Sequence, residues 1–146
     1  MSNESKAEIM REFVKSMEAL DTDRVISLCT EDFEWLTPMK HFKGKEGLKQ
    51  FMKWLAESVK DYKVTESGIG ILVDGDKAFF EHTMSGEMQG EKASFLAICT
   101  YEFSGDKIKA CRTVYDRLAI AEQASKQWLP KKLVSTIVNQ MQKGLD

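Results

Sequence analysis

Proline, cysteine and long apolar runs are all scarce in this sequence. The 146 residues include two prolines and three cysteines. The cysteines are scattered and odd in number, which argues against a disulfide framework and against a metal site. No apolar run approaches the roughly 20 residues of a membrane span, and the first residues lack the apolar core of a secretory signal. We therefore expect a chain of the reducing cytoplasm, with no membrane partner and no metal.

An excess of charge of one sign is also lacking. Lysine and arginine total 21 against 23 for aspartate and glutamate, a formal net charge of −2. Nucleic-acid binding relies on clustered positive charge that neutralises phosphates, so no nucleic-acid partner is expected. Hydrophobic residues make up 42% and charged residues 30%, values typical of globular proteins. A chain of this length can bury its own core, and we predict one domain over residues 1–146.

In the first part of the chain, apolar residues recur every three or four positions, the spacing of an amphipathic helix. This pattern predicts a helix over residues 5–20 and another over residues 45–60. A short helix is expected after Asp21, a residue type that caps helix N-termini. Between the helices, residues 32–37 form an extended segment that stops at Pro38.

After Tyr62 the apolar period changes to two, which is typical of β-strands. The predicted strands are residues 62–73, 77–88, 93–104 and 107–117. Asp-Gly-Asp at 74–76 and Ser-Gly-Asp at 104–106 are hairpin signals. The end of the chain returns to helix, broken near Pro130 and resumed over residues 131–144. Helices followed by an antiparallel meander predict an α+β fold.

Several short phrases, in a fixed order, carry a resemblance to a known superfamily. They are Phe13-Val14 followed by Asp21 and Leu28, then Glu31-Asp32-Phe33, Gly44-Lys45-Glu46-Gly47, Tyr101-Glu102-Phe103-Ser104-Gly105-Asp106-Lys107-Ile108, Arg112 and Tyr115-Asp116. Over about residues 5–122 the chain resembles the nuclear transport factor 2-like superfamily, and within it the SnoaL-like branch. The resemblance implies a cone-shaped, curved antiparallel sheet wrapped around the N-terminal helices, a cystatin-like α+β barrel. Residues 123–146 would form a C-terminal helical extension, and the protein would be a homodimer.

The resemblance also points to known catalytic positions, and this sequence departs from three of those patterns. In the ketosteroid isomerase pattern, the general-base position is Thr37, and the oxyanion-hole positions are Phe13 and Cys99. A phenyl ring donates no hydrogen bond and a thiol donates weakly. The cyclase pattern of a histidine and an aspartate falls on Cys99 and Thr113. The limonene epoxide hydrolase pattern of Asp–Arg–Asp falls on His82, Phe80 and Thr113.

If strand parity follows the resembled fold, aromatic and sulfur-containing side chains line a mainly apolar pocket. The candidate ligand-binding residues are Phe13, Met17, Trp35, Thr37, Phe80, Cys99, Tyr101 and Thr113. Such a lining suits a small hydrophobic molecule of flat or bulky shape. The alternative is that these side chains simply fill the core.

The candidate catalytic residues are His82, Tyr115 and Asp116. His82 titrates near neutral pH and could transfer a proton, while Tyr115 would orient a substrate oxygen. The alternative for His82 is a bond to a neighbouring polar group. Asp116 and Arg112 face outward if Tyr115 faces inward, but a one-residue slip at the Gly105 hairpin would bring both into the pocket.

Three classes of function stay open. The first is a cofactor-independent isomerase, cyclase, dehydratase or hydrolase acting on a small hydrophobic substrate. The second is a small-molecule binding protein without catalysis, and the third is a dimerising association domain with a filled core. Cys99 and Cys111 have no obvious electropositive neighbour to lower a thiol pKa, so we expect them to behave as small hydrophobes. Neither a phosphate-binding glycine loop nor metal-ligand spacing occurs, so no cofactor is expected.

Overall fold

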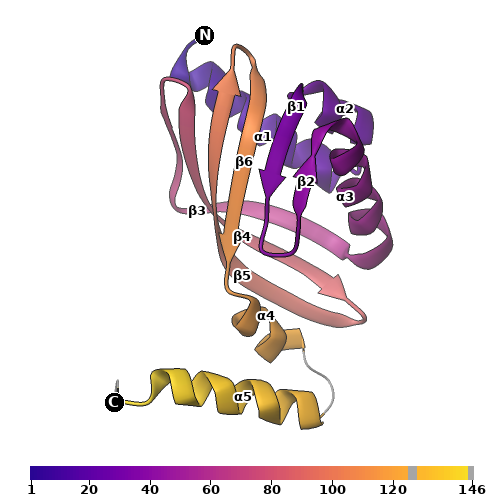
Figure 1. Ribbon diagram of the computed structural model, residues 1–146, viewed down its shortest axis with the longest axis vertical. Coiled ribbons are helices and arrows are strands. Elements are labelled where there is room, and N and C mark those ends of the chain that lie inside the picture. Colours follow the sequence, from indigo (N-terminus) through magenta and orange to yellow (C-terminus); the bar gives the residue numbers. More distant parts are fainter. Residues whose placement is uncertain (125–127, 145–146) are drawn as a thin grey trace.

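Helices precede, flank and follow one sheet in the computed structural model (Figure 1), which describes residues 1–124 and 128–144. The helices are α1 (Asn3–Glu18), α2 (Thr22–Ser27), α3 (Gly44–Ser58), α4 (Arg117–Ala124) and α5 (Trp128–Gln142). The strands are β1 (Cys29–Leu36), β2 (His41–Lys43), β3 (Lys60–Asp74), β4 (Lys77–Met88), β5 (Glu91–Ser104) and β6 (Lys107–Tyr115). The predicted α+β class is confirmed.

The strands form one six-stranded sheet in the order β2-β1-β6-β5-β4-β3. Neighbouring strands are antiparallel except β1 and β6, which run parallel. The register of β3 against β4 shifts between Glu66 and Ile71, where Gly68 and Gly70 adopt positive φ angles of 57° and 70°. Such irregularities bend a strand and increase its twist. The result is the curved, open sheet of Figure 1, with α1 and α3 beside the bent strands.

Most predicted elements match the structure within a few residues, and two differences matter. The prediction missed β2, a three-residue strand that pairs with the end of β1 through Trp35 and Phe42. The C-terminal helix was predicted to resume at Lys131, but α5 begins at Trp128, so Pro130 lies in its first turn. Proline is tolerated there, since the first backbone N–H groups of a helix have no intrahelical acceptor.

The inner face of the sheet is the one that strand parity predicts. On β6, Cys111 and Thr113 are buried while Val114 is 66% exposed. Arg112 points outward and pairs with Glu102 at 2.7 Å on the outer face. The slipped register, which would have turned Arg112 into the pocket, is therefore wrong.

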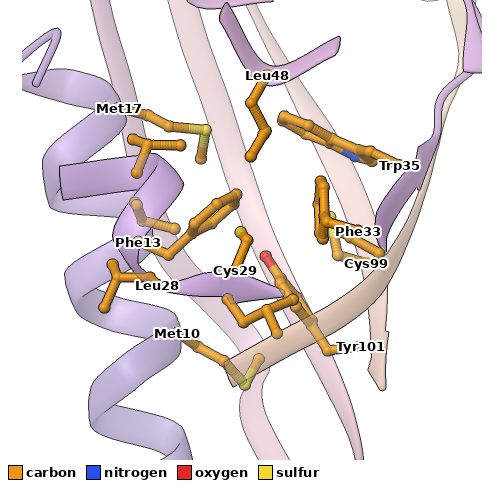
Figure 2. Packing of buried hydrophobic residues seen from close by; sticks show 14 of the residues in the cluster. Met10, Phe13, Met17, Leu28, Cys29, Phe33, Trp35, Leu48, Cys99 and Tyr101 are labelled. Atoms are coloured by element: carbon orange, nitrogen blue, oxygen red, sulfur yellow. The ribbon is translucent and has the colours of Figure 1, made fainter. Parts of the chain in front are cut away.

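The core lies between α1, α3 and the inner face of the sheet (Figure 2). Phe13 is at its centre and has no exposed surface. Its ring centroid lies 6.4 Å from Phe33, 6.0 Å from Trp35 and 6.5 Å from Tyr101, separations typical of packed aromatic pairs. This half of the interior is filled by side chains.

Candidate functional site

A cavity of about 300 Å³ opens beyond the filled core. It lies between α3, the end of β1, the outer halves of β4 and β5, and α4. Its lining consists of Trp35, Thr37, Met39, Phe51, Trp54, Leu55, Val59, Tyr62, Met84, Ser85, Gly86, Met88, Glu91, Ala93, Phe95, Thr113, Tyr115, Arg117, Ile120, Ala121 and Ala124. No α1 residue contributes. Aromatic and aliphatic side chains dominate, so the cavity is apolar with a few polar groups at its walls.

The structure divides the predicted ligand-binding residues into two groups. Trp35, Thr37 and Thr113 line the cavity, and so does the predicted catalytic Tyr115. The others are buried in the core and are absent from the lining: Phe13, Met17, Phe80, Cys99 and Tyr101. The residues of this second group fill the core, which was the alternative to a place in the pocket, because α1 covers that part of the sheet.

Sequence reasoning missed several residues of the cavity wall. Trp54 of α3, Tyr62 of β3 and Ala121 of α4 belong to this set. Trp54 and Tyr62 carried no pattern that distinguishes a cavity wall from a core position. For α4, a helical expectation existed, but nothing in its sequence indicated that it lies across the sheet.

Thr37 lines the cavity but its hydroxyl is already engaged. It donates to the carbonyl oxygen of Lys40 at 2.9 Å and accepts from the amides of Met39 and Lys40 at 3.1 and 3.0 Å. These bonds close the turn between β1 and β2, as hydroxyl side chains commonly do. Thr37 therefore shapes the cavity wall rather than offering a free hydroxyl.

Thr113 is a hydrogen-bonding centre on the cavity wall. Its Oγ1 accepts from Nε1 of Trp35 at 2.8 Å and lies 3.1 Å from Sγ of Cys99 and 3.9 Å from Sγ of Cys111. An indole N–H can only donate, so the hydroxyl proton of Thr113 is left for a sulfur atom or for a molecule in the cavity. Thr113 thereby connects the cavity to the buried thiols behind it.

His82 does not line the cavity. It is 3% exposed, its ring stacks on Phe80 at 4.3 Å, and Nδ1 lies 3.3 Å from the carbonyl oxygen of Phe80. The pairing of Phe80 with Cys99 places His82 and Cys99 as diagonal neighbours on the inner face. Cys99 interacts with His82 and lies 3.1 Å from Oγ1 of Thr113, so these two residues connect His82 to the cavity wall.

The three thiols differ in their acidity. A hydrogen bond with Cys111 lowers the pKa of Cys99, helped by His82 and Thr113 and opposed by burial. Burial and then Cys99 raise the pKa of Cys111, and burial raises the pKa of Cys29 to about 12. No electropositive neighbour of Cys99 was expected from the sequence, but the pairing of β4 with β5 places His82 beside it, and His82 helps to lower the pKa of Cys99.

We expect Cys99 to form a thiolate at a pH where Cys29 and Cys111 stay protonated. The stability that this lowered pKa contributes is complete above the ordinary thiol pKa and is lost as the pH falls through the lowered value. Ultraviolet thiolate absorbance of the wild type should show one step below the ordinary thiol pKa, and Cys99→Ser should remove it. A step that survives in Cys99→Ser would contradict this assignment.

Tyr115 and Asp116 adjoin each other at the end of β6 but have different surroundings. Tyr115 packs against Phe95, with ring centroids 5.3 Å apart, and its pKa is raised by burial and lowered by Arg117. Asp116 is exposed, and its Oδ1 accepts from the amides of Leu118 and Ala119 at 2.8 and 3.2 Å. Asp116 therefore caps the N-terminus of α4 and does not line the cavity.

Within residues 1–124 and 128–144, no group of three or more His, Cys, Asp or Glu side chains could hold a metal ion. In the same part of the chain, no helix is long and apolar enough to cross a membrane.

The chain belongs to the SnoaL-like domain family, whose model matches residues 10–111. No curated protein matches it significantly. Its fold is similar to that of TsrD from Streptomyces laurentii, with a TM-score of 0.76, 19% identity, and coverage of 87% of this chain and 99% of TsrD. An NTF2-like protein of Burkholderia xenovorans matches with a TM-score of 0.72, 17% identity, and 86% and 99% coverage. An LEH-like epoxide hydrolase of Mycobacterium tuberculosis matches with a TM-score of 0.72 and 14% identity, and the match covers 93% of this chain and 98% of the hydrolase. At these identities the likeness concerns the fold.

Proposed function

We propose that this protein binds a small hydrophobic molecule in the cavity formed by α3, α4 and the outer half of the sheet. The observation that carries the proposal is an open apolar cavity of about 300 Å³ beside a fully packed core. Ligand pockets commonly span roughly 300–1,000 Å³ and combine apolar walls with a few polar groups. A molecule with a single ring or a short aliphatic chain fits the lower end of that range.

Two features of the walls support binding rather than simple packing. Trp35, Phe51 and Trp54 form a continuous aromatic wall, with Trp35–Phe51 centroids at 4.5 Å and Phe51–Trp54 centroids at 5.8 Å. Aromatic faces offer large apolar contact with little loss of conformational freedom. At the opposite wall, Met84 and Met88 are adaptable side chains that can adjust to differently shaped ligands.

Native mass spectrometry and thermal unfolding test the proposal together. The native mass of the purified protein is compared with its denatured mass to detect a retained molecule, and the melting temperature is then measured with added hydrocinnamamide, a neutral single-ring probe. A ligand that binds only the folded state raises that temperature in a concentration-dependent manner. An empty protein whose unfolding is unaffected by neutral apolar probes would contradict the proposal.

Catalysis in the same cavity is a second candidate function, favoured by the connection from Thr113 through Cys99 to His82. In this proposal Thr113 would hold a substrate oxygen, and His82 would be a positioning and proton-storing residue behind Cys99. Tyr115, whose ring also lines the cavity, would supply a second hydroxyl. Turnover of a retained molecule that is lost in Cys99→Ala, with binding kept, would support catalysis. Equal turnover in Cys99→Ala would contradict it.

We further propose a homodimer formed through the outer face of the sheet. Leu96 on β5 and Val114 on the neighbouring β6 are 53% and 66% exposed on that face, and Leu72 on β3, beyond β4, is 55% exposed. Removing apolar area of this kind from water is a main driving force of association. We expect Val114→Lys to convert a dimer to a monomer in sedimentation velocity, whereas Leu133→Lys on α5 leaves the dimer intact. A monomeric wild type would refute the proposed dimer.

A further inference from the structure

Two charged side chains occur in the described cavity lining, and they come from different elements. Arg117 is the first residue of α4, and Glu91 is the first residue of β5. Their separation follows from how α4 is attached at its two ends. Near its start, Nη1 of Arg117 lies 3.4 Å from the carbonyl oxygen of Pro38, in the turn after β1. Near its end, Oε1 of Gln123 accepts from the amide of Ser94 at 2.9 Å, close to the β4–β5 hairpin.

Arg117 and the β4–β5 hairpin that carries Glu91 therefore lie near opposite ends of α4. The eight residues of α4 rise by about 1.5 Å each, so the helix axis covers about 10 Å between its ends. Arg117 is at the end of α4 near the β1–β2 turn, and Glu91 is near its other end, at the β4–β5 hairpin. We expect an anion at the Arg117 end, because the guanidinium attracts it while the Glu91 carboxylate repels it.

Arg117 also differs from the other arginines in its partners. Arg11 pairs with Glu8 and Glu66, Arg24 with Glu12, and Arg112 with Glu102. Among the described residues, Arg117 has no carboxylate within ion-pair distance, and its hydrogen bond to Pro38 is long. Its charge reaches the neighbouring Tyr115 hydroxyl, whose pKa it lowers against the effect of burial. An exposed guanidinium with no carboxylate partner among the described residues thus lines the same apolar cavity as the Tyr115 hydroxyl.

We propose that the ligand class of this cavity is the hydrophobic monocarboxylates, with the carboxylate bound by Arg117 and the apolar body inside. The inference rests on the proposed binding function and specifies its ligand. The planar guanidinium presents paired N–H donors that match the two oxygens of a carboxylate. Tyr115 can donate a further hydrogen bond from the cavity wall. The body of the ligand then extends past Thr113 and Phe95 toward the β4–β5 hairpin.

The test compares two probes of nearly equal shape, hydrocinnamate and its neutral amide, by isothermal titration calorimetry. Wild type should bind the acid about tenfold more tightly than the amide, the ratio that corresponds to about 1.4 kcal/mol. Arg117→Gln should lower the affinity for the acid to that for the amide, and it should leave the affinity for the amide unchanged. Arg112→Gln is the matched control, because Arg112 lies on the outer face, and it should behave as wild type.

The outcomes separate this inference from the function on which it rests. If wild type binds acid and amide equally, or if Arg117→Gln keeps the preference for the acid, the carboxylate assignment is overturned and the binding function stands. If Arg112→Gln loses the preference as well, the effect comes from net charge and the assignment to Arg117 is overturned. If neither probe binds at any concentration, the binding function fails and the inference fails with it.

Discussion

We expect Ala121→Trp to abolish ligand binding, with a loss of affinity for hydrocinnamamide of at least about a hundredfold. Ala121 lies on α4 and its small side chain is part of the cavity wall. An indole at this position would occupy space that the ligand needs, while α4 stays attached through Gln123 and Arg117. The affinity is measured by isothermal titration calorimetry, with far-ultraviolet circular dichroism to verify folding.

Ala56→Trp is the matched control for this prediction. Ala56 is exposed on α3 and is not part of the cavity lining. Ala56→Trp introduces the same side chain into a helix without filling the cavity, so its affinity for hydrocinnamamide should equal that of wild type. Unchanged binding by a folded Ala121→Trp protein would show that the ligand binds elsewhere.

The second large effect is on stability, at the centre of the core. Phe13→Ala removes a ring that has no exposed surface and contacts Phe33, Trp35 and Tyr101. Because the surrounding rings are held on two strands of the sheet, β1 and β5, they cannot all move to fill the void. Substitutions of this kind cost about 3–5 kcal/mol in the free energy of unfolding, measured by urea denaturation.

Phe79→Ala serves as the comparison for Phe13→Ala. Phe79 lies on β4 with the opposite parity to Phe80, on the outer face, and is only partly buried. Phe79→Ala should lower the free energy of unfolding by less than half as much as Phe13→Ala, because removing a partly buried ring leaves little cavity. Equal costs for the two variants would contradict the placement of the core between α1 and the sheet.

The sequence predicted the fold well because the signals for the fold are periodic. A spacing of three and four marked α1 and α3, and a spacing of two marked β3 to β6. Parity on β6 correctly placed Cys111 and Thr113 inside and Arg112 outside. The short α2 was predicted from its cap at Asp21, but β2 was not predicted. β2, at three residues, shows no alternation long enough to detect.

The site was predicted only in part, because parity gives the face of a side chain but not its depth along the strand. Tyr101 and Thr113 both face inward, yet Tyr101 is packed under α1 while Thr113 borders the cavity. That difference depends on where α1 ends and where α4 crosses the sheet. Neither position follows from local sequence, so Phe80 and Cys99 were taken for cavity residues and Arg117 was overlooked.

Two threonines of the cavity lining have defined hydrogen-bond partners. Thr37 closes a turn, and Thr113 holds Trp35 and Cys99 through its hydroxyl. The described cavity lining includes hydroxyls and one guanidinium, which suit recognition of a ligand oxygen, together with the carboxylate of Glu91. A thiol–imidazole pair lies behind Thr113, and its acidity is the property that a catalytic role would use.

Amide chemical-shift mapping of the isotope-labelled protein, titrated with hydrocinnamamide, tests the central claim most directly. If the cavity is the binding site, the largest shifts will fall on Phe95, Tyr115 and Ala121, while Met10 and Phe13 in the filled core and Leu72 on the outer face stay unchanged. Shifts confined to the outer face or to α5, or none at saturating probe, would contradict a ligand-binding cavity in this protein.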